Sequence, residues 1–238
     1  MLNKELIEKK FANSIDCYDD NAIIQKIMAD KLVSLIQKRK FKSILEIGSY
    51  SGVLTKKIID KFEFEEYLAL DIVDSFEKIK NLSEKISFKQ IDVEKFNTDK
   101  KFDLIVANAS LQWCNDFDGT IKKLKSYLAD DGIFAITTFV TDNFFEIRDT
   151  FKTSLNYKTV KEIQNLFSPS TTIIQEIHVM QFKNSKDLLN HFKLTGVNAI
   201  EGANFGISKI RKCMDILDKK YQNKLTYKPV YIIENSKK

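Results

Sequence analysis

The chain has 238 residues, of which 43% are hydrophobic and 30% charged, so one sizeable core can form and intrinsic disorder is excluded as the dominant state. No apolar run is long enough for a membrane span or a signal peptide, and the few glycines exclude a collagen-like chain. Three distant cysteines and two histidines do not combine at any zinc-ligand spacing, so we expect a reduced, cytoplasmic, metal-free protein. The net charge of +5 does not by itself indicate nucleic-acid binding.

Helical and extended patterns alternate over the first 140 residues. An amphipathic helix is predicted over residues 25–37, with its apolar face toward a sheet. Short β-rich runs follow at residues 43–47, 67–70, 86–90, 104–108 and 132–139, and helical stretches at 53–61, 76–81 and 117–128 lie among them. Such an alternation predicts an α/β fold with a mostly parallel sheet and right-handed crossovers.

The later part of the chain is mainly helical. Helices are predicted over residues 144–155, 159–166, 186–194 and 208–219, around one strand at 173–181 and before a last strand at 227–233. We expect a seven-stranded sheet with a helical cap inserted between late strands. No Pro/Gly linker separates the parts, so one domain is predicted: an N-terminal arm and helix (1–40), a cofactor-binding core (41–140), a cap and substrate region (141–224) and the last strand (225–238).

The first predicted strand runs directly into a glycine-containing loop and a helix, which is where an open α/β sheet binds nucleotide-like ligands. Glycines there let the backbone approach a ligand closely. A dinucleotide site would have glycine at positions 50 and 53, where this chain has Tyr50 and Val53, so an NAD site is disfavoured. The loop consists of Glu46, Ile47, Gly48, Ser49, Tyr50, Ser51 and Gly52.

Polar side chains end the next three predicted strands. Asp71 follows the loop by about twenty residues, where a carboxylate can accept both ribose hydroxyls. Asp92 can meet an adenine amino group, and Asn108 ends the fourth strand. Glu46 can face a cationic group, and S-adenosylmethionine carries an ammonium and a sulfonium. Any one acid could merely cap a helix, but the ordered set favours S-adenosylmethionine as cofactor, with S-adenosylhomocysteine as product.

Residues 40–140 resemble the class I S-adenosylmethionine-dependent methyltransferases, and the resemblance implies a Rossmann-like fold. Tyr50 departs from the glycine that this family usually has at the middle of the loop, so it must avoid positive φ or bear its cost. Residues 11–25, with Phe11, Ser14, Tyr18, Asp19, Ala22 and Gln25, and residues 108–114, with Asn108, Gln112, Trp113 and Cys114, resemble signatures of the BioC family, the malonyl-acyl carrier protein O-methyltransferases.

This resemblance implies methyl transfer to the free carboxylate of a malonyl thioester on acyl carrier protein, giving the methyl ester for pimeloyl and biotin synthesis. Such a carboxylate is ionised at neutral pH and needs no general base. Tyr18, Gln112 and Trp113 are the expected catalytic residues, with Tyr18 and Gln25 closing the pocket and Phe11 as an apolar wall; alternatively, Phe11 or Tyr18 only pins the arm. The expected cofactor contacts are Phe11, Tyr18, Gln25, Glu46, Gly48, Ser49, Tyr50, Gly52, Asp71, Ile72, Asp92, Val93 and Asn108.

The sequence also offers candidate residues for binding the substrate's carboxylate and for docking its carrier protein. Arg148 and Lys193 can bind a carboxylate, although such residues are more often solvated surface charges. Residues 183–224 hold nine Lys/Arg and four Asp/Glu, a net of +5, and this basic face would steer an acidic carrier; a merely solvated face explains it equally well. We expect a monomer with no nucleic-acid or membrane partner. A methyltransferase for a free small carboxylic acid and a non-catalytic binding module remain alternatives.

Overall fold

A computed structural model describes residues 1–38, 40–197 and 206–236. Its main sheet has seven strands in the order β3-β2-β1-β4-β5-β9-β6. Strands β1 to β5 run parallel to their neighbours, whereas β9 pairs antiparallel with both β5 and β6. The predicted seven-stranded, mostly parallel sheet is therefore confirmed. The strands are β1 (Lys40–Ile47), β2 (Glu63–Asp71), β3 (Ile86–Gln90), β4 (Phe102–Asn108), β5 (Leu128–Phe139), β6 (Thr172–Gln175) and β9 (Pro229–Asn235).

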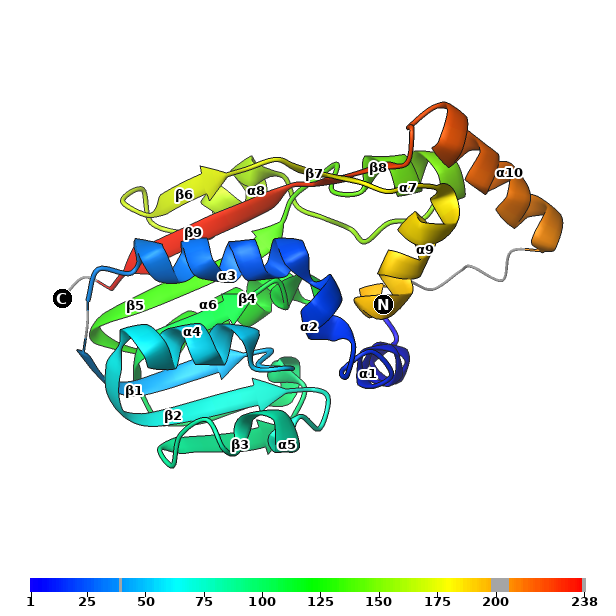
Figure 1. Cartoon of the computed structure of the whole chain (residues 1–238). Coiled ribbons are helices and arrows are strands. Elements are labelled where there is room, and N and C mark those ends of the chain that lie inside the picture. The colour runs from blue at the N-terminus through cyan, green and yellow to red at the C-terminus, as the bar shows by residue number, and fades with distance from the viewer. Residues whose placement is uncertain (39, 198–205, 237–238) are drawn as a thin grey trace.

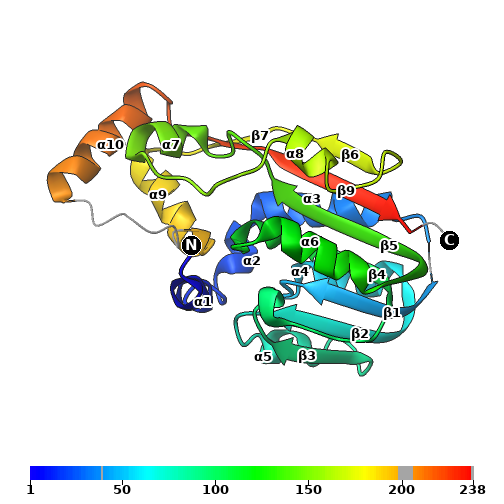
Figure 2. The same cartoon turned by 180° about the vertical axis from the view of Figure 1, so that it is seen from behind.

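Helices cover both faces of this sheet (Figure 1). The helices α3 (Ile23–Leu35) and α4 (Val53–Lys61) pack on one face, where Met28, Leu32 and Ile58 are fully buried. The helices α6 (Phe117–Ser126) and α8 (Val160–Gln164) cover the other, as Figure 2 shows for α6. Because both faces are covered, the inner strands are apolar along most of their length. A short helix, α5 (Phe76–Ile79), follows β2.

Two of the predicted strands are each divided in two. The expected strand over 173–181 consists of β6 and β7 (His178–Gln181), and the expected last strand over 227–233 consists of β8 (Lys224–Tyr227) and β9. β7 and β8 form a separate two-stranded antiparallel sheet. Pro229 lacks a backbone N–H and stands at the first position of β9, where a strand tolerates it. The single-strand expectations were wrong because both segments leave the main sheet at this point.

The cap expected over 141–224 also contributes to the main sheet, through α8 and β6. The remaining elements, α7 (Phe145–Phe151), α9 (Ser185–Leu194), α10 (Ile207–Lys219) and the β7–β8 pair, extend beyond the carboxyl ends of the parallel strands (Figure 1). The predicted helix over 144–155 ends early because Lys152 adopts φ 56. None of the helices in the described ranges is long and apolar enough to span a membrane.

The N-terminal arm lies at the same edge of the sheet. It forms two helices, α1 (Lys4–Ala12) and α2 (Tyr18–Asn21), ahead of α3. In Figure 1, α1 and α2 lie where the arrowheads of β1 and β2 point, with α9 alongside. The carboxyl edge of the sheet is therefore enclosed by the beginning of the chain on one side and by the late helices on the other.

Candidate active site

Three residues of the loop after β1 adopt positive φ, the left-handed region of backbone conformation. Gly48, Tyr50 and Gly52 have φ values of 76, 43 and 82. A Cβ on Gly48 would lie 2.4 Å from the Cβ of Ser110, so glycine is required there by the approach of the chain after β4 as well as by φ. Ser110 donates to the carbonyl oxygen of Ile47 over 2.9 Å, which fixes this approach.

Tyr50 adopts positive φ, which costs a residue with a Cβ about 1–2 kcal/mol. Two sets of contacts offset that cost. Its backbone N–H donates to Oδ2 of Asp71 over 2.9 Å. Its hydroxyl donates to the carbonyl oxygen of Phe11 over 2.6 Å and lies 3.0 Å from Oγ of Ser14, while its ring meets those of Phe11 and Tyr18 edge-on. The residue that replaces the usual glycine thus attaches the arm to the loop.

A cavity of about 730 Å³, counted with the space at its mouth that is open to solvent, lies beside this loop. Its walls come from the arm, from the loop and from the ends of β2, β3 and β4. Of the expected site residues it is lined by Phe11, Tyr18, Gly48, Tyr50, Asp71, Ile72, Asp92, Val93, Asn108 and Trp113. The lining residues that were not expected to contact the cofactor are Lys4, Ile7, Ile47, Leu70, Ile91, Ala109, Ser110 and Cys114.

Asp71 is the buried acid of this cavity, with 7% of its surface exposed. Oδ1 accepts from the N–H of Val73 over 2.8 Å, and Oδ2 accepts from that of Tyr50. Burial raises the pKa of Asp71 to about 6, against the opposing effect of these N–H groups. Each oxygen keeps a lone pair for a further donor.

These features fit S-adenosylmethionine. The spare lone pairs of Asp71 suit a pair of ribose hydroxyls, and a second acid, Asp92, stands on the same wall. The ring of Phe11 lies edge-on to that of Trp113, with 5.4 Å between ring centroids, so the cavity also has aromatic walls that suit a cationic or heteroaromatic ligand. In the described part of the chain, no group of three or more His, Cys, Asp or Glu is arranged to hold a metal ion.

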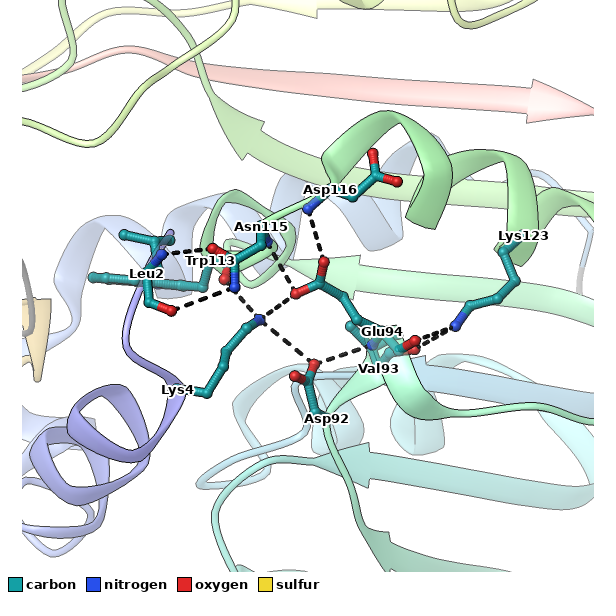
Figure 3. Close-up of polar contacts among 9 residues, drawn as sticks. All are labelled: Leu2, Lys4, Asp92, Val93, Glu94, Trp113, Asn115, Asp116 and Lys123. Carbon is teal, nitrogen blue, oxygen red and sulfur yellow. Dashed lines mark hydrogen bonds and ion pairs between the residues drawn. The ribbon is translucent and has the colours of Figure 1, made fainter.

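Lys4 ties the arm to the far side of the cavity (Figure 3). Its Nζ lies 2.6 Å from Glu94 and 3.5 Å from Asp92, and donates to the carbonyl oxygen of Trp113 over 2.9 Å. Glu94 also accepts from the N–H groups of Asn115 and Asp116. Although partial burial disfavours its charge, these donors hold the pKa of Glu94 below its usual value. These contacts of Lys4 and Glu94, which we call the clasp, join α1, the end of β3 and the loop after β4.

The sequence analysis missed this clasp, although a signal for it exists. Lys4, Ile7 and Phe11 are spaced i, i+3 and i+7, so they lie on one face of a helix. That face lines the cavity. A polar and two apolar residues on a three-turn helix are too few to distinguish a lid from an ordinary surface helix by sequence alone.

Glu46 lies beneath the loop and does not line the cavity. It is fully buried, and its Oε2 accepts from Oγ1 of Thr55 and from the hydroxyl of Tyr67, both over 2.6 Å. Desolvation raises its pKa to about 7 despite these two bonds. Its Oε1 has no partner among the described residues. The structure thus makes Glu46 a support of the loop, while Ser49 and Gly52 also lie outside the cavity wall.

Three amide side chains lie in the site or behind it. Nδ2 of Asn108 donates to the carbonyl oxygen of Gln25 over 2.9 Å, and Oδ1 of Asn108 accepts from Thr137 over 2.7 Å. Gln25 is 5% exposed and lines a smaller chamber behind Tyr18 rather than the cofactor cavity. Gln112 lines the same chamber, with its Nε2 bonded to the carbonyl oxygen of Ala109.

The two candidates for binding the carboxylate are not brought to the site. Arg148 pairs with Asp142 over 2.7 Å at the surface, and its side chain is 47% exposed. Lys193 is exposed on α9. Neither residue lines the cofactor cavity or the chamber behind it. Both α7 and α9 turn their apolar faces to the cap interior, which leaves these two cations outside.

Comparison with known proteins identifies the family. Residues 21–201 match the family model of a methyltransferase domain. A malonyl-(acyl-carrier protein) O-methyltransferase of Calditerrivibrio nitroreducens is 33% identical over 235 residues, covering 93% of this chain and 92% of that relative. The malonyl-(acyl-carrier protein) O-methyltransferase 2 of Ilyobacter polytropus is 32% identical over 188 residues, covering 73% of this chain and 72% of that relative.

Solved structures show the same fold at low sequence identity. The YcgJ protein of Bacillus subtilis superposes with a TM-score of 0.66 at 13% identity, covering 89% of this chain and 99% of that one. The N-methyltransferase NodS of Bradyrhizobium japonicum, in complex with S-adenosyl-L-homocysteine, gives a TM-score of 0.52 at 15% identity, covering 88% and 86%. The Rossmann-like methyltransferase fold expected from the sequence is confirmed. The chain belongs to the methyltransferase domain family and, within it, to the malonyl-(acyl-carrier protein) O-methyltransferases, the BioC family.

Proposed function

We propose that this protein transfers the methyl group of S-adenosylmethionine to the free carboxylate of a malonyl thioester carried by acyl carrier protein, the step that supplies the methyl ester for pimeloyl and biotin synthesis. The observation that carries the proposal is the 33% identity to a malonyl-(acyl-carrier protein) O-methyltransferase over 92% of its length. An acid-walled cavity beneath an N-terminal arm supports it, because that cavity suits the cofactor which such an enzyme requires.

The cofactor, when bound, supplies an electrophilic methyl group on a sulfonium. Asp71 would bind its ribose hydroxyls and Asp92 would lie near its adenine end, with the rings of Phe11 and Tyr50 on one side, since all four residues line the cavity. The arm excludes water, which keeps the ionised carboxylate poorly solvated and reactive. Since that carboxylate is already charged at neutral pH, the protein has only to orient it in line with the methyl group, and orientation can contribute roughly 7–11 kcal/mol.

Tyr18 and Trp113 stand where donor and acceptor would meet. Both residues line the cofactor cavity and also the chamber behind it. A carboxylate oxygen in that chamber forms the new bond to the methyl carbon, the electron pair of the broken bond stays on sulfur, and the product is a neutral ester. We assign Tyr18, Gln112 and Trp113 to the walls that orient the substrate.

We further propose that the acidic carrier docks on the basic face formed by α9 and α10. Arg211, Lys212 and Lys219 are exposed on α10. Residues 198–205 of the basic stretch predicted over 183–224 lie outside the described part of the chain. We propose that the enzyme acts as a monomer and that it works in the cytoplasm, where its unpaired cysteines would remain reduced.

The test is mass spectrometry of malonyl-carrier protein after incubation with enzyme and S-adenosylmethionine. We expect the mass of one added methyl group on the malonyl-carrier protein. Malonyl-coenzyme A should be methylated much more slowly, and free malonate should not be methylated. Methylation of free malonate at the same rate would show that the chain acts on small carboxylic acids instead. Absence of methylation together with binding of S-adenosylhomocysteine would contradict the proposed substrate.

A further inference from the structure

Three hollows follow one another along the carboxyl edge of the sheet. The first is the cofactor cavity of about 730 Å³. Behind Tyr18 and Trp113, which line both, lies a narrow chamber. Beyond Gln112 and Tyr157, which line the chamber and the next hollow, lies an open vestibule of about 1330 Å³.

The chamber has no charged side chain in its described lining. Its polar residues are Tyr18, Gln25, Gln112, Tyr157 and Thr195, and its remaining walls are apolar or aromatic. Such a lining suits a carboxylate that is to lose its charge. A cation would bind the ionised substrate strongly but bind the forming ester weakly, and so would stabilise the ground state more than the transition state.

Two hydroxyl groups on the chamber wall have a hydrogen to donate. The hydroxyl of Tyr157 accepts from Nδ2 of Asn143 over 3.1 Å, and no described residue accepts its own O–H. The hydroxyl of Tyr18 has no hydrogen-bond partner in the described ranges. Burial raises the pKa of both phenols above the usual value, so both remain protonated donors. The amide oxygen of Gln25, buried on the same wall, is also without a partner.

The vestibule opens between the loop after α7 and the start of α6. Amide and hydroxyl side chains dominate its polar wall, among them Thr153, Ser154 and Asn156. Its one lysine, Lys158, is paired with Asp118. The loop after α7 lines the vestibule, and α7 itself packs against the basic helix α10, whose Lys219 lines a separate hollow with Lys152.

We propose that the vestibule binds the amide-containing thioester arm of the carrier protein, and that the chamber holds the substrate's carboxylate between the hydroxyls of Tyr18 and Tyr157. The inference rests on the proposed function and extends it to the route of the substrate. A long neutral arm with amide groups matches the vestibule wall, and its charged end reaches a chamber that offers uncharged donors. Tyr157 and Asn156 thereby become substrate-binding residues.

The test measures the binding of malonyl-carrier protein by calorimetry, with the enzyme saturated in S-adenosylhomocysteine so that no turnover occurs. Asn156→Trp narrows the vestibule at an exposed loop position, and Tyr157→Phe removes one donor. We expect each variant to weaken the binding of malonyl-carrier protein about tenfold. For Tyr157→Phe this is the loss expected when a hydrogen bond to a charged group is removed. Affinity for S-adenosylhomocysteine should stay unchanged in both variants, and so should the melting temperature of Asn156→Trp. Tyr157→Phe also loses the bond from buried Asn143 and should melt at a lower temperature.

Asn97→Trp is the matched control, at an exposed loop position ahead of β4 that lines none of the three hollows. If Asn156→Trp binds the carrier as tightly as Asn97→Trp does, the route through the vestibule is wrong. If wild type binds malonyl-carrier protein with the expected losses in the variants but methylates nothing, the route stands and the proposed function fails. A wild type that does not bind this carrier contradicts both.

Discussion

At the residue scale, the substitution of the usual glycine by Tyr50 changes how the loop functions. A glycine would adopt φ 43 without cost, whereas tyrosine pays for that conformation and gains contacts with Phe11, Ser14 and Tyr18. The sequence shows the departure from the family but not its consequence, because the partners of the ring lie more than thirty residues away in the chain.

Tyr50→Phe removes the bonds to Phe11 and Ser14 and keeps the ring. We expect a loss of about 1 kcal/mol in unfolding free energy, a severalfold weaker affinity for S-adenosylhomocysteine and faster proteolysis within residues 1–22. Calorimetry and limited proteolysis measure these effects. Tyr127→Phe, which removes one bond to Phe96 on the other face of the sheet, is the control. Equal proteolysis of the two variants would show that Tyr50 does not hold the arm.

Asp71 predicts how cofactor binding depends on pH. Its pKa in the free protein is raised to about 6, so the carboxyl becomes protonated as the pH falls through that value. Ribose hydroxyls need the ionised acceptor, and affinity for S-adenosylhomocysteine should therefore be constant from pH 7 to 8 and fall toward tenfold per unit below about pH 6. Asp71→Asn should bind S-adenosylhomocysteine more than tenfold more weakly at pH 7.5, and its affinity should no longer depend on pH. Asp99→Asn, in the exposed loop ahead of β4, is the control and should bind like wild type. A pH-independent wild type would remove Asp71 from the site.

At the element scale, the core of the fold could be predicted and the connections could not. Periodicity placed β1 to β5 and α4 because their apolar residues face a two-sided core, and the same reading placed Asp71, Asp92 and Asn108 at strand ends. It did not place Glu46, because a buried acid beside Thr55 and Tyr67 has the same sequence pattern as an acid that faces a ligand. Tyr157 was missed because its loop has no periodicity at all.

The helix α1 is the element whose position tests the site most directly. Lys4→Ala leaves Glu94 partly buried without its ammonium partner, and we expect weaker S-adenosylhomocysteine binding and exposure of α1 to protease. Lys9→Ala, on the exposed side of the same helix, should change neither. Because the pKa of Glu94 is lowered in the folded protein, the clasp contributes above the ordinary pKa of glutamate and is lost as acid protonates Glu94. If Lys4→Ala binds ligand like wild type, α1 is not a lid.

At the scale of the whole molecule, α7 packs against the basic helix α10, and the loop that follows α7 lines the vestibule. The chain as a whole carries a net +5, yet the described walls of the chamber carry no charge. In the proposed function, long-range attraction and local binding are therefore separated: exposed cations on α10 would act on the carrier's surface, and uncharged groups would act on its arm. Attraction between exposed charges is screened over about 10 Å at 0.1 M salt, whereas hydrogen bonds in the chamber are not.

This separation predicts a salt dependence that differs between substrates. The value of kcat/KM for malonyl-carrier protein should fall steeply as salt rises from 0.05 to about 0.5 M, while that for a short malonyl thioester without a carrier should change little. Lys212→Glu on α10 should raise KM for the carrier substrate severalfold and leave kcat unchanged. Lys42→Glu, exposed at the amino end of β1 and away from the cap, alters net charge equally and should have less effect. Equal effects of the two reversals would mean that net charge alone, and not a docking face on α10, attracts the carrier.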